Sequence, residues 1–205
     1  MREHEGKASG ETMSSVPKRR LRLGITGSAG VGKTTLGRRL AEILAVPFVG
    51  EGMRARIEAG LDLHTLDSEG RRALLLELFE QTLTVTRAAV GAADGFVSDR
   101  CSIDFAAFWL YYGFGFDEDA TQRVFARAER ALAGYDLIVV LPWGAIPLLA
   151  DGVRSANPWL QLHYQVLLEG LLARYADTGR VVQLPLKVVG IEERVRWICT
   201  HLESV

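Results

Sequence analysis

Apolar positions form two alternating patterns along the chain from residue 21 onward. Short runs of four to six residues predict buried strands, and they are separated by longer stretches in which apolar residues recur at helical spacing. The run DLIVVL, at residues 136–141, is the clearest of the predicted strands. Strands that alternate with helices in this way predict an α/β fold, with a mostly parallel sheet that carries helices on both faces.

The pattern also gives approximate boundaries for each element. Strands are predicted at residues 21–26, 46–49, 95–98, 136–141 and 180–184. Helices are predicted at 33–44, at 66–90 as one long helix or two, and at 102–112, 118–132, 157–175 and 191–202. Asn157 is a predicted N-cap, because Pro158 after it suits the first turn of a helix. We expect residues 21–205 to form one domain and the polar residues 1–20 to be a disordered tail.

Composition narrows the classes of function. The 205 residues are 48% hydrophobic and carry a formal net charge of −1, which suits one globular domain with a sizeable core. A near-neutral balance argues against bulk binding to nucleic acid or to an anionic membrane, and the basic residues 18–20 with Arg22 are expected to be a solvated flank. Cys101 and Cys199 have no spacing that indicates a zinc site or a disulfide framework. Neither a secretory signal nor a membrane-spanning apolar run is found, so we expect a cytoplasmic protein.

The segment GSAGVGKT lies between the first predicted strand and the first predicted helix. It fits G-x-x-x-x-G-K-[ST], a phosphate-binding motif that requires this strand-to-helix placement. Glycines allow successive N–H groups to point at a phosphate, and the helix N-terminus adds a positive dipole end. Lys33 would contact the β- and γ-phosphates, and the hydroxyl of Thr34 would bind Mg²⁺. The residues predicted to bind ATP are Gly27, Ser28, Ala29, Gly30, Val31, Gly32, Lys33, Thr34 and Thr35.

Acidic residues at the carboxyl ends of strands are the next candidates, because ligands gather at that edge of an open α/β sheet. Asp99 closes the strand GFVSD, so we predict that it binds Mg²⁺, directly or through water, or accepts the proton of an acceptor hydroxyl. A helix N-cap is the alternative role for Asp99. Glu51 follows the second strand, where small-molecule kinases often place an acidic acceptor-binding residue; by that analogy it is an acceptor-binding carboxylate, and without it an ordinary loop residue. Asp104 is a weaker candidate, and Asp136 belongs to the opposite edge as a turn or cap residue.

Basic residues near the same edge could contact the substrates. Arg100 and Arg54 follow the third and second strands, and either could bind the acceptor. The connection PWGAIPLLADGVRSANP after the fourth strand is long enough to be a functional lid. In it, Arg154 could approach the transferring phosphoryl group and Asp151 could shape the turn or contact substrate. Aromatic residues of the predicted helix 102–112, after the third strand, are either core or an acceptor-pocket wall: Phe105, Phe108, Trp109, Tyr111 and Tyr112.

Three of these stretches together resemble a known family. GSAGVGKTTL, the strand end SDR with its aromatic helix, and IPLLADGVRS are similar to the P-loop domains related to the nicotinamide-riboside kinase half of the bacterial bifunctional NAD-salvage regulator. Members carry an IP-x-x-x-DG-x-R-S stretch, which Ile146-Pro147, Asp151-Gly152 and Arg154-Ser155 match here. The resemblance implies a nucleoside-kinase-like fold, binding of ATP and Mg²⁺, and phosphoryl transfer to a small hydroxyl acceptor. The chain lacks the regulator's adenylyltransferase and DNA-binding parts, so a role in NAD salvage is not implied.

The leading hypothesis is therefore an ATP-dependent kinase for a nucleoside or a similar hydroxyl compound. A regulatory GTP switch is the second hypothesis, but the base-reading motif N/T-K-x-D is missing, since Val188-Val189 follows Lys187. The third is an ATPase that hydrolyses ATP without a small-molecule acceptor. Either Asp99 or Glu51 could be the base of the kinase reaction.

Overall fold

The sheet has five strands and is parallel throughout. The computed structural model describes residues 21–62, 65–92, 95–147 and 157–202. The strand order is β2-β3-β1-β4-β5, and each neighbouring pair is parallel. The α/β class and the five-stranded sheet predicted from the sequence are confirmed. The strands are β1 (Leu21–Thr26), β2 (Phe48–Val49), β3 (Gly95–Asp99), β4 (Leu137–Val140) and β5 (Val181–Gln183).

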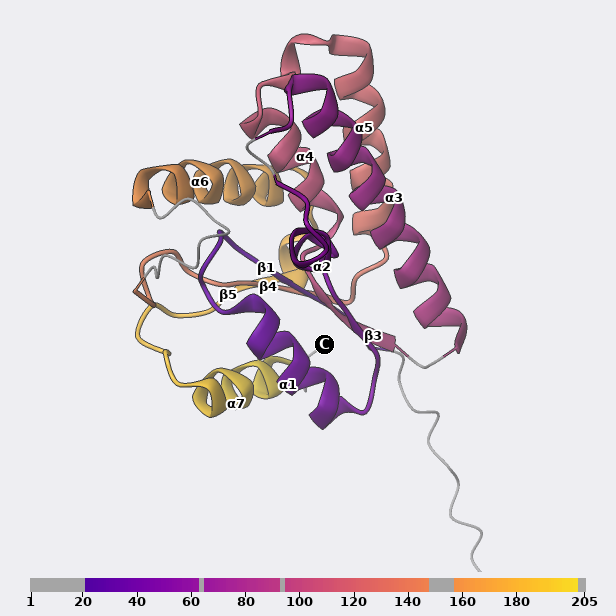
Figure 1. The fold of residues 1–205 in the computed structure, drawn as a ribbon. Coiled ribbons are helices and arrows are strands. Elements are labelled where there is room, and N and C mark those ends of the chain that lie inside the picture. The colour runs from indigo at the N-terminus through magenta and orange to yellow at the C-terminus, as the bar shows by residue number, and fades with distance from the viewer. Residues whose placement is uncertain (1–20, 63–64, 93–94, 148–156, 203–205) are drawn as a thin grey trace, which may run out of the picture.

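Helices cover both faces of this sheet. In Figure 1, α1 and α7 lie together below it, α4 to α6 lie above, and α3 runs down beside it on the right while packing in the same core as α4. The helices are α1 (Lys33–Leu44), α2 (Met53–Glu58), α3 (Ser68–Ala92), α4 (Ser102–Tyr111), α5 (Glu118–Leu132), α6 (Pro158–Tyr175) and α7 (Ile191–Leu202), with 3-10 turns η1 (Phe114–Phe116) and η2 (Thr178–Arg180). The segment predicted as one helix or two is the single 25-residue helix α3. Helix α2 and the two 3-10 turns were not predicted, because six residues or fewer are too short to show a helical period.

The strands bury alternate side chains in two separate cores. Leu137 and Val139 of β4 pack in the core under α1 and α7, while Ile138 and Val140 pack in the core under α3 to α6. Successive side chains of a strand point to opposite faces, so a strand covered on both faces is apolar at every position. This is why β4 was the clearest strand in the sequence.

Three strands are shorter than predicted, and one of them, β4, lacks the first and last residues of its predicted range 136–141. The predicted second strand begins at residue 46, but β2 begins at Phe48, after Pro47. Proline has no N–H to donate to a ladder, and Pro47 takes part only through its carbonyl, which accepts from the Val97 N–H at 2.9 Å. At the start of the fifth predicted strand, Arg180 instead ends the 3-10 turn η2.

An ion pair between Arg22 and Asp136 lies at the amino-terminal edge of the sheet. The carboxylate of Asp136 accepts hydrogen bonds from the Arg22 guanidinium and backbone, with a shortest ion-pair distance of 2.8 Å. The pair lies at the start of β4 and in β1, which agrees with the assignment of Asp136 to the edge away from the phosphate motif. Arg22 is half-buried in this pair, so its prediction as a solvated flank is wrong.

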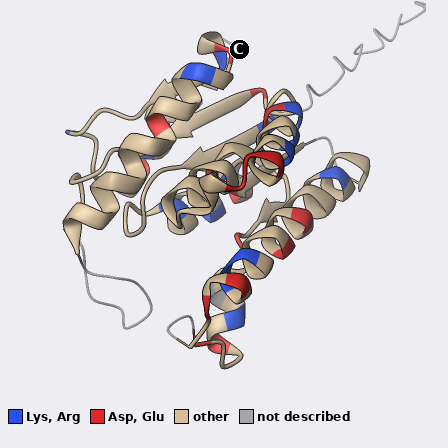
Figure 2. Cartoon of the chain, turned by 90° about the horizontal axis from the view of Figure 1, so that it is seen from above, with Lys and Arg blue, Asp and Glu red and all other residues tan. Residues whose placement is uncertain are grey.

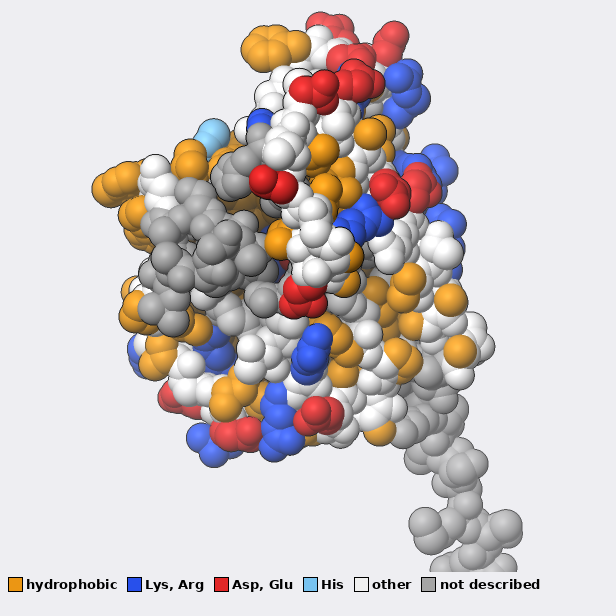
Figure 3. All heavy atoms as spheres, viewed as in Figure 1, with side chains coloured by type: hydrophobic (Ala, Val, Ile, Leu, Met, Phe, Trp, Pro, Cys, Tyr) orange, Lys and Arg blue, Asp and Glu red, His pale blue; other side chains and the backbone are white. Residues whose placement is uncertain are grey.

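The surface is mixed in character. Figure 2 shows basic and acidic residues interspersed over the helices, in keeping with the net charge of −1. Apolar side chains reach the surface among polar ones on the face in Figure 3, and Phe116, Trp159 and Leu186 are exposed. Among the helices that the structure describes, none is both long enough and apolar enough to cross a bilayer. Cys101 and Cys199 are both free thiols.

Parallel pairing brings the carboxyl ends of the central strands to one place. Ile25 of β1 is in register with Asp99 of β3, and Thr26 is in register with Val140 of β4. The glycine-rich turn therefore leaves the middle strand with β3 on one side and β4 on the other. Ligands of open α/β sheets bind at this edge, so the topology places the predicted motif where a ligand can reach it.

Candidate functional site

The glycine-rich loop adopts a conformation that favours glycine. Gly27 has φ of 136° and Gly32, the N-cap of α1, has φ of 91°. A Cβ at Gly27 would lie 2.8 Å from the carbonyl oxygen of Leu141, which is closer than carbon and oxygen can approach. A residue with a side chain would be strained by the positive φ and would collide with Leu141, so this position requires glycine for the loop to turn tightly after β1.

Lys33 is buried at the start of α1. Its ammonium donates a hydrogen bond to the carbonyl oxygen of Ser28 at 2.6 Å. Burial and the positive charge of Arg100 lower the pKa of Lys33 from 10.5 to about 8, an effect that nearby carboxylates such as Asp99 partly offset. The lysine thus sits in the turn that it would leave to contact a phosphate, in surroundings that favour the arrival of negative charge.

Thr34 and Asp99 form a pair beside this lysine. The Thr34 hydroxyl donates a hydrogen bond to Oδ2 of Asp99, whose other oxygen, Oδ1, is buried with no hydrogen-bond partner. A hydroxyl and a carboxylate are the hard oxygen donors that Mg²⁺ accepts, and an orphaned buried carboxylate oxygen fits a cation. Within the described residues no group of three or more His, Cys, Asp or Glu could hold a metal.

Arg100 follows Asp99 in a strained backbone conformation. Its φ is 82°, which is uncommon for a residue with a side chain and costs on the order of 1–3 kcal/mol. This turn directs the guanidinium between two carboxylates, with Nη1 2.9 Å from Oδ1 of Asp104 and Nε 3.2 Å from Oε2 of Glu51. The group also lies 4.6 Å from the ring centroid of Phe108. Burial opposes the charge on Arg100, but Glu51 and the other acidic partners outweigh it and raise its pKa well above the ordinary value.

Asp104 is the centre of a buried hydrogen-bond network. It accepts from the Thr26 hydroxyl at 2.6 Å, from the Tyr164 hydroxyl at 2.7 Å and from the Cys101 N–H at 2.9 Å. Burial and the charge of Asp104 raise the pKa of Tyr164 well above its usual range, which keeps the phenol as a donor. The network joins β1, α4 and α6 directly beneath the site.

The same network settles which residue caps α4. Cys101 is the N-cap, and Asp104 is the N3 residue of a capping box with it. The alternative role of Asp99 as the N-cap is therefore wrong.

Aromatic residues of α4 divide between core and site. Phe105 and Trp109 are buried in the core, at 2% and 0% exposure. Phe108 stacks on Tyr164 with centroids 4.4 Å apart, and Tyr112, which is 41% exposed, stacks on Phe108 at 5.9 Å. Because Phe108 also covers Arg100, this part of α4 is both packed and adjacent to the site.

The predicted site residues have different outcomes. The structure brings Lys33, Thr34, Asp99, Arg100 and Glu51 together at the carboxyl edge of the sheet. Arg54 lies on α2, and the structure does not describe its side chain. Asp151 and Arg154 lie outside the described residues.

Three residues that contact the glycine-rich loop were missed by the sequence analysis. Gln165 and Gln161 of α6 accept hydrogen bonds from the N–H groups of Ser28 and Ala29, at 2.7 Å and 3.0 Å. Arg194 of α7 is buried and donates from Nη1 to the carbonyl of Val31 at 2.8 Å. The one available signal was the pair of glutamines four residues apart in a helix that is otherwise largely apolar.

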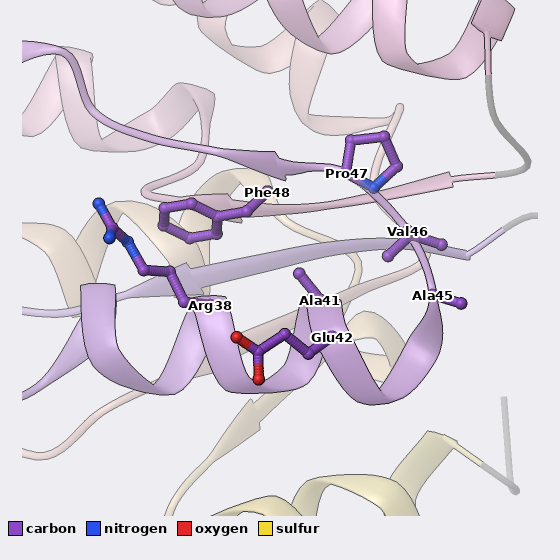
Figure 4. Close-up of a pocket in the computed structure, with 7 residues that line it drawn as sticks. All are labelled: Arg38, Ala41, Glu42, Ala45, Val46, Pro47 and Phe48. Carbon is purple, nitrogen blue, oxygen red and sulfur yellow. The ribbon is translucent and has the colours of Figure 1, made fainter.

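A second concave region lies away from this site. The hollow in Figure 4, of about 450 Å³, is formed by the C-terminal half of α1 and the connection to β2. It contains no residue of the glycine-rich loop, so we do not place a phosphate there. Its lining residues are Arg38, Ala41, Glu42, Ala45, Val46, Pro47 and Phe48.

A glycine-rich loop between a central parallel strand and a helix, with a buried lysine and a Thr–Asp pair, defines a P-loop nucleotide-binding domain. A model of the AAA domain family matches residues 22–194, and the chain belongs to this family. No curated protein sequence matches the chain.

Solved structures share the fold over most of the chain. The NadR protein in complex with NAD and AMP-PNP has a TM-score of 0.67 at 19% identity, covering 90% of this chain and 49% of NadR. NadR in complex with NR has a TM-score of 0.64 at 20% identity, with coverage of 90% and 50%. Deoxyadenosine kinase from M. mycoides, with dCMP and dCDP bound, has a TM-score of 0.64 at 11% identity, with coverage of 90% and 100%. These likenesses confirm the resemblance at the level of the fold, and this chain spans about half the length of NadR.

Proposed function

We propose that the protein transfers the γ-phosphoryl group of ATP to a hydroxyl of a small acceptor, a nucleoside or a nucleoside-like metabolite. One observation carries the proposal: a phosphate-binding lysine, a metal-suited Thr–Asp pair and a carboxylate–arginine pair meet at adjacent strand ends. A nucleotide switch needs the first two features, whereas the Glu51–Arg100 pair adds a carboxylate suited to an acceptor hydroxyl.

On the ATP side, the backbone N–H groups of the predicted loop and the N-terminus of α1 would hold the phosphates, chiefly from Gly30 to Thr35, because the N–H groups of Ser28 and Ala29 already donate to α6. Lys33 would leave the carbonyl of Ser28 and bind the β- and γ-phosphates. Thr34 and Asp99 would hold Mg²⁺, which offsets the negative charge of the phosphates when bound. Asp99 is assigned here to the metal because Thr34 already engages one of its oxygens.

On the acceptor side, we assign Glu51 as the base. Its carboxylate would take the proton from the acceptor hydroxyl as that oxygen bonds to the γ-phosphorus. The bond between the γ-phosphorus and the β–γ bridging oxygen breaks, and ADP leaves. Arg100 lies between Glu51 and Asp104, with its Nε 3.2 Å from Oε2 of Glu51. We infer that this ion pair orients the Glu51 carboxylate and that Arg100 and Glu51 contact the acceptor together.

The roles assigned from the sequence to the other candidates complete the proposal. Arg54 and Asp151 would contact the acceptor, and Arg154 would approach the transferring phosphoryl group. The aromatic side chains of Phe108 and Tyr112 would bound the acceptor pocket, since planar rings pack against them. The ligands NR, named for NadR, and dCMP, named for the deoxyadenosine kinase, support a nucleoside-like acceptor, and AMP-PNP, an ATP analogue named for NadR, supports ATP as the donor.

The proposal is tested by a transfer screen with γ-labelled ATP against nucleosides, nucleoside monophosphates and other small hydroxyl compounds. Lys33→Ala is the blank, because it removes the phosphate-binding ammonium. We expect a labelled product that depends on one acceptor class and is absent from the blank. Label released only as free phosphate, at a rate that no acceptor changes, would replace the kinase with the ATPase hypothesis.

A further inference from the structure

Two glutamines of α6 bind the N–H groups of Ser28 and Ala29 in the P-loop. The proposed transfer reaction gives these glutamines no role. Gln165 Oε1 accepts from the Ser28 N–H at 2.7 Å, and Gln161 Oε1 accepts from the Ala29 N–H at 3.0 Å. Residues four apart lie on the same face of a helix. Thus one face of α6 presents two carbonyl oxygens, one turn apart, to two consecutive N–H groups of the loop.

The buried member of the pair is fixed at both ends of its amide. Gln165 is 2% exposed, and its Nε2 donates to the carbonyl of Leu141 at 3.1 Å and to Oε1 of Glu169 at 2.7 Å. Leu141 in turn donates its N–H to the carbonyl of Thr26, where β1 ends. Gln165 therefore bridges the two strand ends between which the P-loop begins.

Both glutamines hold peptide groups of the residue that receives Lys33: Gln165 accepts from the Ser28 N–H, and Gln161 accepts from the Ala29 N–H, which shares a peptide group with the Ser28 carbonyl. The Lys33 ammonium donates to the Ser28 carbonyl at 2.6 Å, and the N–H of the same residue donates to Gln165. A shift of α6 that moved Ser28 would also move the acceptor of the lysine. The position of Lys33 before a nucleotide binds thus depends on α6. Gln165 of that helix is 137 residues from Ser28 along the chain.

We propose that Gln161 and Gln165 are positioning residues, which hold the first turn of the P-loop in its phosphate-binding conformation before a nucleotide arrives. A loop that is already ordered loses less conformational entropy on binding, so the glutamines raise the affinity for nucleotide phosphates. The inference goes beyond the proposed transfer reaction, because it requires only that the loop bind a nucleotide.

Gln161→Ala is the better test of the two, because Gln161 is half-buried and its loss leaves the Gln165 bridge in place. Val166→Ala is the matched control, since Val166 lies on the same helix and is 59% exposed. Two properties are measured in each protein: the Kd for Mg·ADP by calorimetry, and the hydrogen exchange of the Ala29 amide by NMR without nucleotide. We expect Gln161→Ala to weaken ADP binding about fivefold and to speed Ala29 exchange, since one neutral hydrogen bond is lost.

A conservative variant separates positioning from a role in helix stability. Gln161→Glu keeps an acceptor oxygen for Ala29 but adds a negative charge near the phosphates. Ala29 exchange should return toward the wild-type rate, while ADP binding stays weak. If Gln161 only stabilised α6, its replacement would change the thermal midpoint and leave Ala29 exchange equal in Gln161→Ala and Val166→Ala.

The proposal is overturned if Ala29 exchanges at the wild-type rate in Gln161→Ala, or if that variant binds ADP with wild-type affinity. Neither measurement uses an acceptor or a turnover. If the protein transferred no phosphoryl group, the proposed function would be wrong, but the ADP affinity and the Ala29 exchange would still decide the role of the two glutamines.

Discussion

Raising the pH from 7 to 9 should weaken the binding of Mg·ATP about tenfold, through one group, Lys33. Its pKa in the free protein is about 8, because burial and the charge of Arg100 disfavour the ammonium. Phosphates favour the ammonium, so binding should raise the pKa of Lys33 back toward its ordinary value of 10.5, which is used here for the bound state. Below pH 8 the lysine is already charged and the affinity is level. Between about pH 8 and 10.5 binding must take up a proton, and the Kd rises by the factor (1 + 10^(pH−8))/(1 + 10^(pH−10.5)).

This factor is close to 1 at pH 7 and about 11 at pH 9, and the uptake is about half a proton at pH 8. Calorimetry at pH 8 in two buffers of different ionisation enthalpy measures the uptake directly, and a titration series from pH 7 to 9 measures the change in Kd. Lys33→Ala is the control, since it should bind more weakly and lose the pH dependence. An affinity that stayed constant from pH 7 to 9, or an equal slope in Lys33→Ala, would refute the assignment of the shift to this lysine.

Two further substitutions test the rest of the site. Glu51→Gln should lower kcat for phosphoryl transfer on the order of 10²- to 10⁴-fold, because it removes the base. The Kd for ATP should stay within about twofold, because the P-loop is left intact. A kcat within tenfold of wild type would show that the base is another group. Asp104→Asn should lower the free energy of unfolding by about 2–4 kcal/mol in urea denaturation, since an amide N–H would face the donors Thr26 and Cys101. Asp136→Asn is its control: the Asp136 side chain is 19% exposed, whereas that of Asp104 is fully buried, so its loss should cost less, and equal losses in the two variants would contradict the buried-network argument.

Local features of the sequence account for the framework of the fold. The strand and helix bounds of β1, α1, α5 and α7 follow directly from runs and periods of apolar residues, because each pattern reports on neighbours within a few residues. The P-loop is also contiguous, so its glycines, Lys33 and Thr34 could be identified without any knowledge of the sheet. Asp99 and Glu51 required one further rule, that the carboxyl ends of parallel strands form one edge.

Contacts between distant segments were decided by tertiary structure alone. Asp104 could be listed only as a weak acidic candidate, yet burial makes it the centre of a network that spans 78 residues to Thr26. The strained turn at Arg100 could not be read from the residues before it, since its direction is set by two carboxylates that fold into place around it.

The glutamines of α6 show the limit most clearly. In the sequence they are two polar residues four apart in a largely apolar helix, a spacing that indicates a shared face but not what that face contacts. Their role arises because the packing of α6 brings their oxygens to the N–H groups of a loop at the other end of the chain. Sequence patterns report which side chains one element buries, whereas hydrogen bonds between elements depend on how those elements are placed in space. The motif was therefore determined locally, and the position that makes it a site was determined by the fold.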